Sequence, residues 1–532
     1  VFHPHCRLYA EFAGNKYELV PNDRYTLTKF FGRSAYKHFS FHVSIPMGEG
    51  EFGQVRFFAE DENYSAPLKW RFTFAHSKLT QRLKASYWRA GGRIFTMNGE
   101  QNALLAKKSG FFRALGHELK LYVNMLGKGH GSRKLAFKAM GLRWLYWLTR
   151  PFYAKRHIWV MFDKLYKGGD CGEYFYRYAC AQDDGIHKQY ILNGDSPFFP
   201  MLKKEGYKPT RRTSARQLLG FLNADIIFAT HTNIYSFCSF GGKIEFFFRD
   251  LYNFDVTCIQ HGLTTQAIAM YQHKLKDNTK RYYCASKYEI GSLEHPVYGY
   301  DPADLCLTGV PRHDGLVNRA KKQILLTPTW RQNLALPSIM GTARRYNVEF
   351  KNSTYYKYLN ELIHDEALLS CARKNGYTLK YLLHPAVSVQ AEDFSVEGID
   401  DVVEILTGSG DLSYEQLLTE SALMITDYSG VQFDFAYQRK PIVYYHHAEI
   451  PPHYEEGCFD YATMAFGEIC TDNPTTVAVL IDYMENDCRM KEQFIARADD
   501  FFAYSDHGNC ARIYADAMEH LQAPRMAKKA AK

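Results

Sequence analysis

Two successive series of short apolar runs, each alternating with helical patterns, constrain the fold of this chain most. The first series extends from residues 157–162 to 305–309, and the second from 322–327 to 441–445. Apolar runs of about four to eight residues separated by helical patterns are typical of parallel strands covered by helices. We therefore expect an α/β fold with two doubly wound, Rossmann-like domains. The first covers residues 156–318, and the second covers 319–532 and includes C-terminal helices.

The residues before these series follow two other patterns. Alternating apolar and polar residues at 7–12, 38–43, 54–59 and 69–74 predict strands, and hence a small β-sandwich-like domain over residues 1–100. Residues 101–155 predict a basic amphipathic helical segment. No acidic residue occurs between Glu118 and Asp163, whereas nine Lys and Arg residues alternate there with Trp, Tyr and Leu. This pattern is typical of a helix on anionic lipid, and a connecting helix with a basic solvent-facing side is the alternative.

Composition limits the class of protein. A chain of 532 residues is too long for one core, and no run approaches the ~18 apolar residues of a transmembrane helix. The net charge of +8 is compatible with nucleic acid, membrane or anionic substrate as partner. No RNA-binding motif accompanies that charge, so we expect no nucleic acid. The 12 cysteines form no Cys-x-x-Cys pair, which favours reduced thiols in the cytoplasm and no metal site.

A polar turn at residues 426–430 lies between an apolar run and a helical pattern. Free N–H groups and the positive end of the helix dipole suit a phosphate at such a position. The Ser429 hydroxyl adds a donor, and Gly430 allows close approach to the backbone. An ordinary capped strand–turn–helix is the alternative.

Three further motifs lie where predicted strands end. They are Gln260-His261-Gly262, Thr327-Pro328-Thr329-Trp330-Arg331 and His384-Pro385. The carboxyl ends of parallel strands line the ligand site in doubly wound sheets. A single histidine at a strand end is more often a structural hydrogen-bonding group. Two histidines together with an arginine, and with a turn at 426–430 that could bind phosphate, predict a ligand-binding site.

Together these motifs resemble those of the CDP-glycerol glycerophosphotransferase family, the teichoic acid polymerases and primases, which have a two-domain GT-B fold. The resemblance is carried by the His-Gly loop at 259–262, Pro-Thr-Trp-Arg at 328–331, His-Pro at 384–385 and the Thr-Asp-Tyr-Ser signature at 426–434. The loop 457–461, and Asp163 with residues 170–173, are similar to further family elements. The resemblance covers about residues 155–500 and leaves residues 1–100 outside it.

Two positions depart from the family pattern. Gln266 stands where the family usually has lysine, and Gly430 stands where it usually has a second serine. One cation and one hydroxyl of the expected site are therefore missing.

The resemblance implies a transferase that moves glycerol phosphate, or another polyol phosphate such as ribitol phosphate, from a CDP-activated donor. The acceptor would be a hydroxyl of a lipid-linked teichoic-acid-like or capsular polymer, and CMP would leave. His261 would be the catalytic base, a role that suits a neutral imidazole. His384 and Arg331 would hold the diphosphate, and Asp427 would order the turn or meet the glycerol end. The other substrate-binding positions would be Thr329, Ser429, Gly430, Gly262 and Gln266.

The expected partners follow from the same resemblance. They are CDP-glycerol or CDP-ribitol as donor, a lipid-linked polymer as acceptor, and an anionic membrane surface. We expect a cytoplasmic protein, peripheral on the inner face of the cell membrane, without a tightly bound cofactor. A weakly bound Mg²⁺ stays open. The alternatives are a GT-B glycosyltransferase that uses a nucleotide sugar, and a non-catalytic membrane-docked binding subunit, for which Gln266 and Gly430 are the argument.

Overall fold

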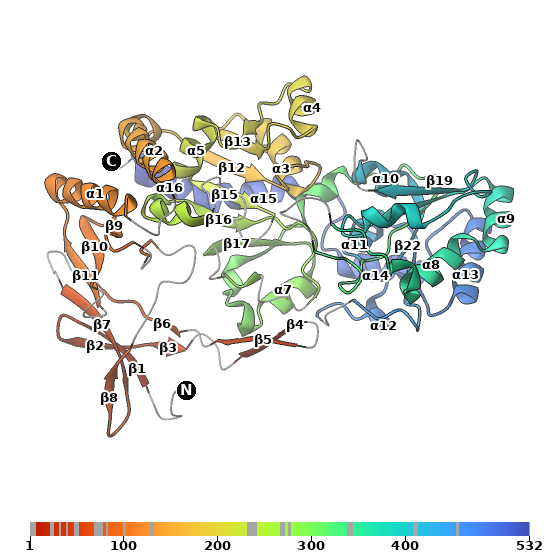
Figure 1. Cartoon of the computed structure of the whole chain (residues 1–532), viewed down its shortest axis with the longest axis horizontal. Helices are drawn as coiled ribbons and strands as arrows, with labels where there is room; N and C mark the ends of the chain where they lie inside the picture. The colour runs from red at the N-terminus through yellow and green to blue at the C-terminus, as the bar shows by residue number, and fades with distance from the viewer. Residues whose placement is uncertain are drawn as a thin grey trace.

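The computed structural model contains three large β-sheets in chain order, arranged along the long axis of the molecule (Figure 1). The first sheet is antiparallel and the other two are parallel. The structure describes residues 7–21, 26–30, 33–38, 41–46, 53–68, 78–80, 83–98, 103–127, 132–230, 242–266, 272–274, 278–337, 344–407, 413–453 and 457–530.

The N-terminal sheet has the strand order β2-β1-β7-β11-β10-β9, with β8 paired to β7. Its strands are β1 (Arg7–Phe12), β2 (Asn15–Glu18), β7 (Gly53–Glu60), β8 (Ser65–Pro67), β9 (Tyr87–Ala90), β10 (Arg93–Asn98) and β11 (Ala103–Lys108). Two short antiparallel ribbons accompany it, β3 (Val20–Pro21) with β6 (Phe41–His42) and β4 (Thr26–Phe30) with β5 (Arg33–His38). The strand expected at 69–74 lies outside the described residues.

Part of the buried core of this sheet packs on a helix, where the sequence predicted a second sheet. Tyr87 and Ile94 share a buried cluster with Leu121 and Met125 of helix α1 (Phe111–Met125). Alternating patterns do not distinguish a sheet that faces a sheet from one that faces a helix. The boundary expected at residue 100 also lies inside the sheet, since β11 pairs with both β10 and β7.

Helices α1 and α2 (Arg133–Tyr153) make up most of the basic segment, and an ion cluster attaches them to the first parallel sheet. The fully buried Arg143 guanidinium lies 2.6 Å from a Glu118 carboxylate oxygen and 2.8 Å from Asp250. Burial raises the pKa of the Glu118 carboxyl, but the Arg143 charge outweighs this and lowers it to about 2.

Glu118→Gln is expected to reduce the free energy of unfolding at pH 7 by about 3 kcal/mol, because it removes one partner of a buried charge. The folded pKa of Glu118 is below its ordinary value of 4.5. Its contribution is therefore complete above pH 4.5 and is lost as the pH falls towards 2. Urea unfolding at pH 7, 5 and 3 measures this. The free energy of unfolding should fall less steeply with decreasing pH in the variant than in the wild type, and Glu62→Gln, at an exposed position, is the control. Equal slopes for all three proteins would contradict this.

The first parallel sheet has the order β14-β13-β12-β15-β16-β17-β18. Its strands are β12 (Ile158–Phe162), β13 (His187–Leu192), β14 (Thr210–Arg211), β15 (Ile226–Ala229), β16 (Asp255–Cys258), β17 (Thr279–Cys284) and β18 (Leu305–Leu307). The accompanying helices are α3 (Cys171–Cys180), α4 (Phe198–Lys204), α5 (Ala215–Leu222) and α7 (Lys287–Leu293), with 3₁₀ turns that include η3 (Arg249–Leu251) and η7 (Pro311–Gly315). We call this sheet and its helices the first half.

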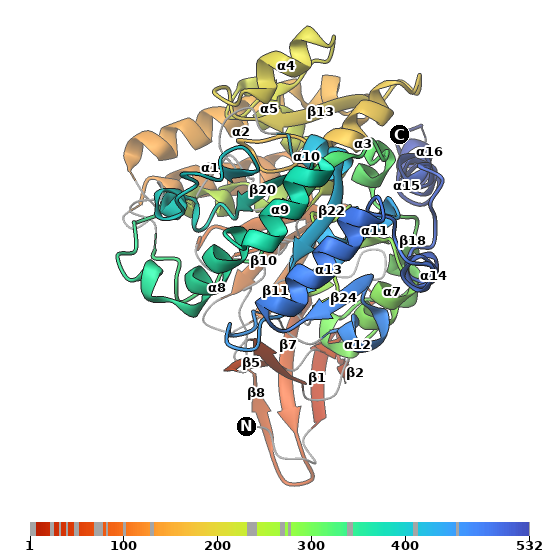
Figure 2. The same cartoon turned by 90° about the vertical axis from the view of Figure 1, so that its right-hand side faces the viewer.

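The second parallel sheet has the order β21-β20-β19-β22-β23-β24. Its strands are β19 (Lys321–Leu326), β20 (Thr378–Leu383), β21 (Val403–Thr407), β22 (Ser421–Thr426), β23 (Ile442–Tyr445) and β24 (Gly467–Cys470). Its helices are α8 (Thr354–Ile363), α9 (Glu366–Asn375), α10 (Tyr414–Glu420), α11 (Val431–Tyr437), α12 (Tyr461–Met464), α13 (Asn473–Glu485) and α14 (Glu492–Phe501). Helices α8, α9 and α13 share one buried cluster and α10, α11 and α14 another. Helices α9 and α13 lie side by side (Figure 2). We call this sheet and its helices the second half.

Both parallel sheets reverse their strand order between the first and fourth strands, β12 and β15 in one and β19 and β22 in the other. Ligands of doubly wound sheets bind at the carboxyl ends of the strands beside such a reversal. The expected α/β fold with parallel sheets is thus confirmed, and Asp163, Thr327 and Asp427 directly follow strands at these two points.

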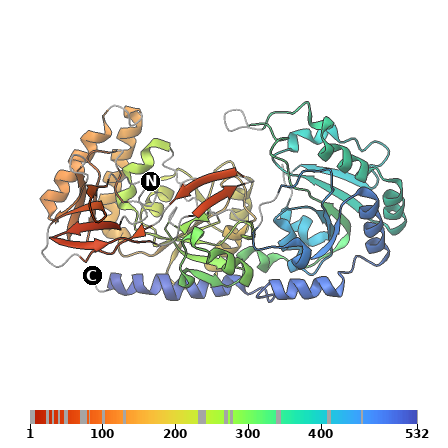
Figure 3. The same cartoon turned by 90° about the horizontal axis from the view of Figure 1, so that it is seen from below.

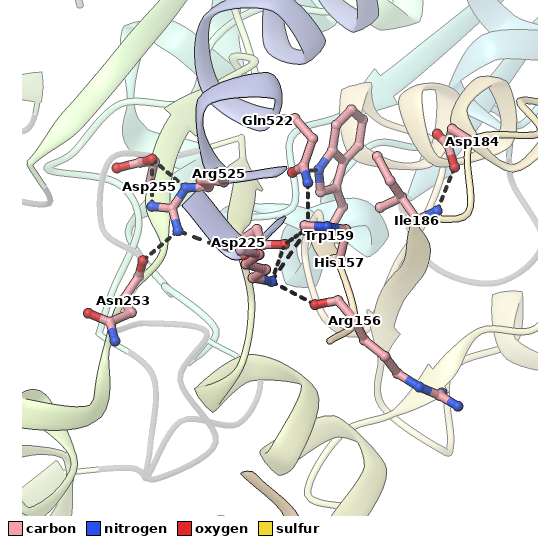
Figure 4. Close-up of polar contacts among 11 residues, drawn as sticks. Arg156, His157, Trp159, Asp184, Ile186, Asp225, Asn253, Asp255, Gln522 and Arg525 are labelled. Atoms are coloured by element: carbon pink, nitrogen blue, oxygen red, sulfur yellow. Dashed lines mark hydrogen bonds and ion pairs between the residues drawn. The ribbon is translucent and has the colours of Figure 1, made fainter. Parts of the chain in front are cut away.

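The last helices return to the first half, although the sequence grouped them with the second domain. Helix α15 (Asn509–Ala517), the π-helical turn η10 (Met518–Gln522) and α16 (Ala523–Ala530) run along the molecule towards the C-terminus (Figure 3). Gln522 accepts a hydrogen bond from the Trp159 indole at 2.9 Å, and Arg525 lies 2.6 Å from Asp255 (Figure 4). Lys529 lies 2.8 Å from Asp225. These contacts decide the packing, and an amphipathic pattern alone does not reveal them.

Across the described ranges, none of the helices is both long enough and apolar enough to cross a membrane.

Candidate functional site

The loop after β16 presents His261 through a strained backbone turn. Gln260 has a left-handed φ of 56°, which is uncommon for a residue with a side chain. Two hydrogen bonds of its buried amide hold it there: Nε2 donates to the Tyr283 carbonyl at 2.7 Å, and Oε1 accepts from the Thr264 N–H at 3.1 Å. The His261 side chain stays 38% exposed. The loop thus fixes the backbone and leaves the imidazole accessible.

His261 is paired with Asp170, a residue that sequence analysis noted but did not assign to the site. Its Nδ1 contacts Asp170 Oδ2, and Asp170 Oδ1 accepts from the Cys171 N–H at 2.8 Å at the start of α3. Burial raises the pKa of the Asp170 carboxyl, but the charges of His261 and Arg312 outweigh it and hold that pKa well below its usual range. An ionised Asp170 accepts the Nδ1–H, which leaves Nε2 of a neutral imidazole to take a proton.

Arg312 joins this pair to the second half, and sequence analysis missed it. Its Nη1 lies 3.1 Å from Asp170 Oδ1 and also donates to the His261 carbonyl. Its Nε donates to Asp434 Oδ1 of helix α11 at 2.7 Å. The available signal was the charged run 312–314, which begins three residues after the end of the strand predicted at 305–309.

In the second half, Asp427 orders the two loops at the strand reversal. Its carboxylate accepts from the Thr329 N–H at 2.7 Å and the Tyr428 N–H at 2.6 Å, and lies 2.8 Å from Arg331. Arg331 also donates to the Pro451 carbonyl at 2.7 Å, and only 5% of it is exposed. Asp427 and Arg331 therefore contact each other and the backbone. The resemblance implied that Arg331 would contact the donor diphosphate, and that contact stays a prediction.

His384 follows β20 and lies among aromatic and cationic groups. Its Nδ1 accepts from the Ala386 N–H at 3.1 Å, and its ring stacks on Trp330 at 6.0 Å. Burial, followed by the charges of Lys164 and Arg344, lowers the pKa of His384 to about 4. At neutral pH its Nε2–H is thus a neutral donor. Arg312, after β18, contacts Asp434 on the helix after β22, so the carboxyl ends of the two sheets face each other.

The remaining predicted residues lie in these same loops. Thr329 has a buried hydroxyl without a hydrogen-bond partner among the described residues. Ser429 is half-buried and Gly430 is exposed at the start of α11, while Gly262 and Gln266 are half-buried in the His261 loop. A Cβ on Gly457 would lie 2.1 Å from the Thr265 carbonyl oxygen, so the His261 loop and the loop at 457 are in direct contact.

Comparison with known proteins identifies the family. A model of the CDP-Glycerol:Poly(glycerophosphate) glycerophosphotransferase family matches residues 149–518. The chain belongs to this family. The expected family membership is thus confirmed.

Two relatives extend this finding. The chain is 32% identical over 502 residues to the minor teichoic acid biosynthesis protein GgaB of Bacillus subtilis (strain 168), covering 93% of this chain and 54% of GgaB. It therefore spans about half the length of that curated relative. The structure of the wall teichoic acid polymerase TagF matches with a TM-score of 0.52 at 15% identity, covering 78% of this chain and 98% of TagF. This likeness shows the fold alone.

The two departures from the family pattern are a missing side chain at Gly430 and an uncharged side chain at Gln266. Gly430 has a φ of −61°, and no atom lies within 4 Å of a Cβ added there, so the serine usual in the family would fit. Gln266 directly follows Thr265, whose carbonyl accepts from the Cys458 N–H at 3.0 Å.

A cavity of about 770 Å³ lies at the other end of the second sheet. It is lined by residues at the amino ends of the strands, among them Lys321, Thr378 and Val403. Doubly wound sheets bind ligands at the opposite, carboxyl ends, where His384 and Asp427 lie.

Proposed function

We propose that this chain transfers glycerol phosphate, or a related polyol phosphate, from a CDP-activated donor to a hydroxyl of a growing teichoic-acid-like or capsular polymer. The observation that carries the proposal is the His261–Asp170 pair at the carboxyl edge of the first sheet. This pair faces the loops of the second sheet that carry Thr329, His384 and Ser429. Family membership and the teichoic acid roles of GgaB and TagF support the reaction class. A TagF variant soaked with CDPG supports the donor class.

In the proposed reaction, each step is carried out by a named residue. His261 Nε2 takes the proton of the acceptor hydroxyl, and the oxygen attacks the phosphorus that carries the polyol. A new oxygen–phosphorus bond forms as the bond to the bridging oxygen breaks, and CMP leaves with that oxygen. Asp170 stabilises the imidazolium that results.

The donor is held mainly by neutral hydrogen-bond donors in the second half. His384 Nε2–H and the half-buried Ser429 would donate to the diphosphate oxygens. The buried Thr329 hydroxyl, which has no hydrogen-bond partner among the described residues, would donate once the donor reaches it. Lys164 and Arg344, whose positive charges add to burial in lowering the pKa of His384, would also stabilise the diphosphate charge. Phosphoryl transfer requires positioning and charge stabilisation of this kind. Asp427 and Arg331 contribute by ordering the loops.

The identity of the nucleotide product tests this proposal against a glycosyltransferase. Purified protein is incubated with CDP-glycerol, CDP-ribitol or a panel of nucleotide sugars, each with a short polyol-phosphate acceptor. CMP from a CDP-polyol supports the phosphotransferase, and the better donor names the polyol. A nucleoside diphosphate from a nucleotide sugar, without CMP from either CDP-polyol, would support the glycosyltransferase.

We further propose that helices α1 and α2 dock on an anionic membrane surface, which would place the chain on the inner face of the cell membrane beside a lipid-linked acceptor. Phe112, Val123 and Leu148 are 84%, 73% and 71% exposed. Cationic residues are exposed on the same two helices: Arg113, Lys120, Arg133, Lys134 and Lys138. Exposed aromatic and aliphatic groups among cations suit the boundary between lipid headgroups and acyl chains.

The double substitution Phe112→Ser with Val123→Ser is expected to weaken binding to phosphatidylserine-containing vesicles at least 10-fold. Each side chain contributes about 1.5–3 kcal/mol when fully buried in an apolar phase. Vesicle co-sedimentation measures the effect. Val348→Ser is the matched control, since Val348 is 75% exposed in the second half. Equal binding by the double variant and the wild type would contradict docking through these helices.

A further inference from the structure

We propose that Arg312 and Asp434 are positioning residues for His261, and that they make its orientation and proton affinity depend on contact between the two halves. The inference deepens the proposed function, because it assumes that His261 is the base of that reaction. The contacts on which it rests do not depend on the identity of the donor.

Four side chains form a continuous path from the second half to the imidazole. Asp434 Oδ1 lies 2.7 Å from Arg312 Nε, and Arg312 Nη1 lies 3.1 Å from Asp170 Oδ1. Asp170 Oδ2 then contacts His261 Nδ1. The exposed fractions of the Asp434, Arg312 and Asp170 side chains are 3%, 13% and 14%, so solvent screens the path weakly. Arg312 also donates to the His261 carbonyl and thus contacts both its backbone and its carboxylate partner.

Arg312 itself is fixed to the first half. In the same 3₁₀ turn, Asp314 accepts from the backbone N–H groups of Asn509 at 2.9 Å and Cys510 at 2.8 Å, at the start of α15. A Cβ on Gly315 would lie 2.3 Å from the Tyr174 ring on α3. Of the four linked side chains, Asp434 is therefore the one contributed by the second half. A movement of the second half away from the first would separate Asp434 from Arg312 before it altered the other contacts of the path.

The charged groups that face His261 have opposing effects on its proton affinity. Asp170 on α3 stabilises the imidazolium, and Arg312 on η7 opposes it. Asp434 on α11 neutralises Arg312 and lies 3.2 Å from His313. Asp163 caps α3 behind Asp170, through its contact of 2.7 Å with the Gly172 N–H, and Glu289 on α7 accepts from the Thr264 N–H of the loop at 2.8 Å. Loss of Asp434 and loss of Arg312 should therefore move the protonation of His261 in opposite directions.

Asp434→Asn and Arg312→Gln test this inference with two readouts. The first is the pH dependence of kcat with CDP-glycerol, whose acid limb reports protonation of the base. The second is acylation by diethyl pyrocarbonate, which modifies neutral imidazole, followed at His261 by peptide mass across the pH range. Asp434→Asn should move both midpoints to lower pH, because Arg312 is then less neutralised, and Arg312→Gln should move them to higher pH. Arg312→Lys should restore part of kcat but not its wild-type value, since lysine lacks the fork that bridges two carboxylates.

The control is Asp401→Asn, which alters an exposed pair with Arg373 in the second half. It should leave both midpoints unchanged. If Arg312→Gln fails to fold, Asp434→Asn and Arg312→Lys still decide the matter. Turnover of CDP-glycerol with unshifted midpoints in Asp434→Asn would overturn the positioning role and leave the proposed function intact. The wild type and Asp434→Asn could also both fail to use CDP-glycerol. If the acylation midpoint of Asp434→Asn then still differs from that of the wild type, the positioning role is supported and the proposed function is rejected.

Discussion

Asp170→Asn is expected to lower kcat for polyol-phosphate transfer by about 10³–10⁴-fold, with KM for the CDP donor changed less than about threefold. The carboxylate accepts the Nδ1–H of His261 and stabilises the imidazolium formed in the reaction. An asparagine amide can donate to Nδ1 instead, which favours the tautomer with hydrogen on Nε2. That tautomer cannot take the acceptor proton through Nε2.

Steady-state CMP formation measures this effect, and Asp401→Asn is again the surface control. The melting temperature of each variant should be recorded, because Asp170 also accepts from the Cys171 N–H at the start of α3. A loss of kcat below about 10-fold in a folded Asp170→Asn protein would show that the pair is not the base assembly.

Asp427→Asn is expected to lower the free energy of unfolding by about 3–5 kcal/mol. The substitution leaves the Arg331 guanidinium, only 6% exposed as a side chain, without its carboxylate at 2.8 Å. It also weakens the acceptor for the Thr329 and Tyr428 N–H groups, which order the two donor-side loops. The variant should therefore bind the donor more weakly as well.

Urea unfolding at pH 7 measures the loss, and Glu404→Gln is the matched control. Glu404 is 57% exposed and lies 3.5 Å from Lys380, so its loss should cost less than about 0.5 kcal/mol. A change in Asp427→Asn as small as in this control would show that Asp427 does not hold Arg331.

The sequence was sufficient to locate the strand ends that make up the candidate site, because these ends can be found from apolar runs alone. His261, His384 and Asp427 each follow such a run, and the carboxyl ends of parallel strands lie along one edge of their sheet. Strands β17 and β24 were not predicted. Lys280 and Arg281 interrupt the first run, and the second is only four residues long.

The partners of the site residues were harder to predict, since they depend on tertiary structure. Asp170 is 91 residues from His261 in sequence, and Arg312 is 122 residues from Asp434. Arg331 belongs to a recognisable motif, yet its pairing with Asp427 depends on which strands are neighbours in the sheet. The same reason explains why the C-terminal helices were assigned to the wrong half: Gln522 and Arg525 find their partners on β12 and β16.

The most direct measurement is CMP formation from CDP-glycerol by the wild type and by His261→Ala, with a short polyol-phosphate acceptor. We expect acceptor-dependent CMP formation by the wild type and a loss of at least about 10³-fold in a folded His261→Ala protein. A His261→Ala variant that forms CMP at the wild-type rate, or a wild type that forms none from any CDP-polyol, would contradict the proposed function.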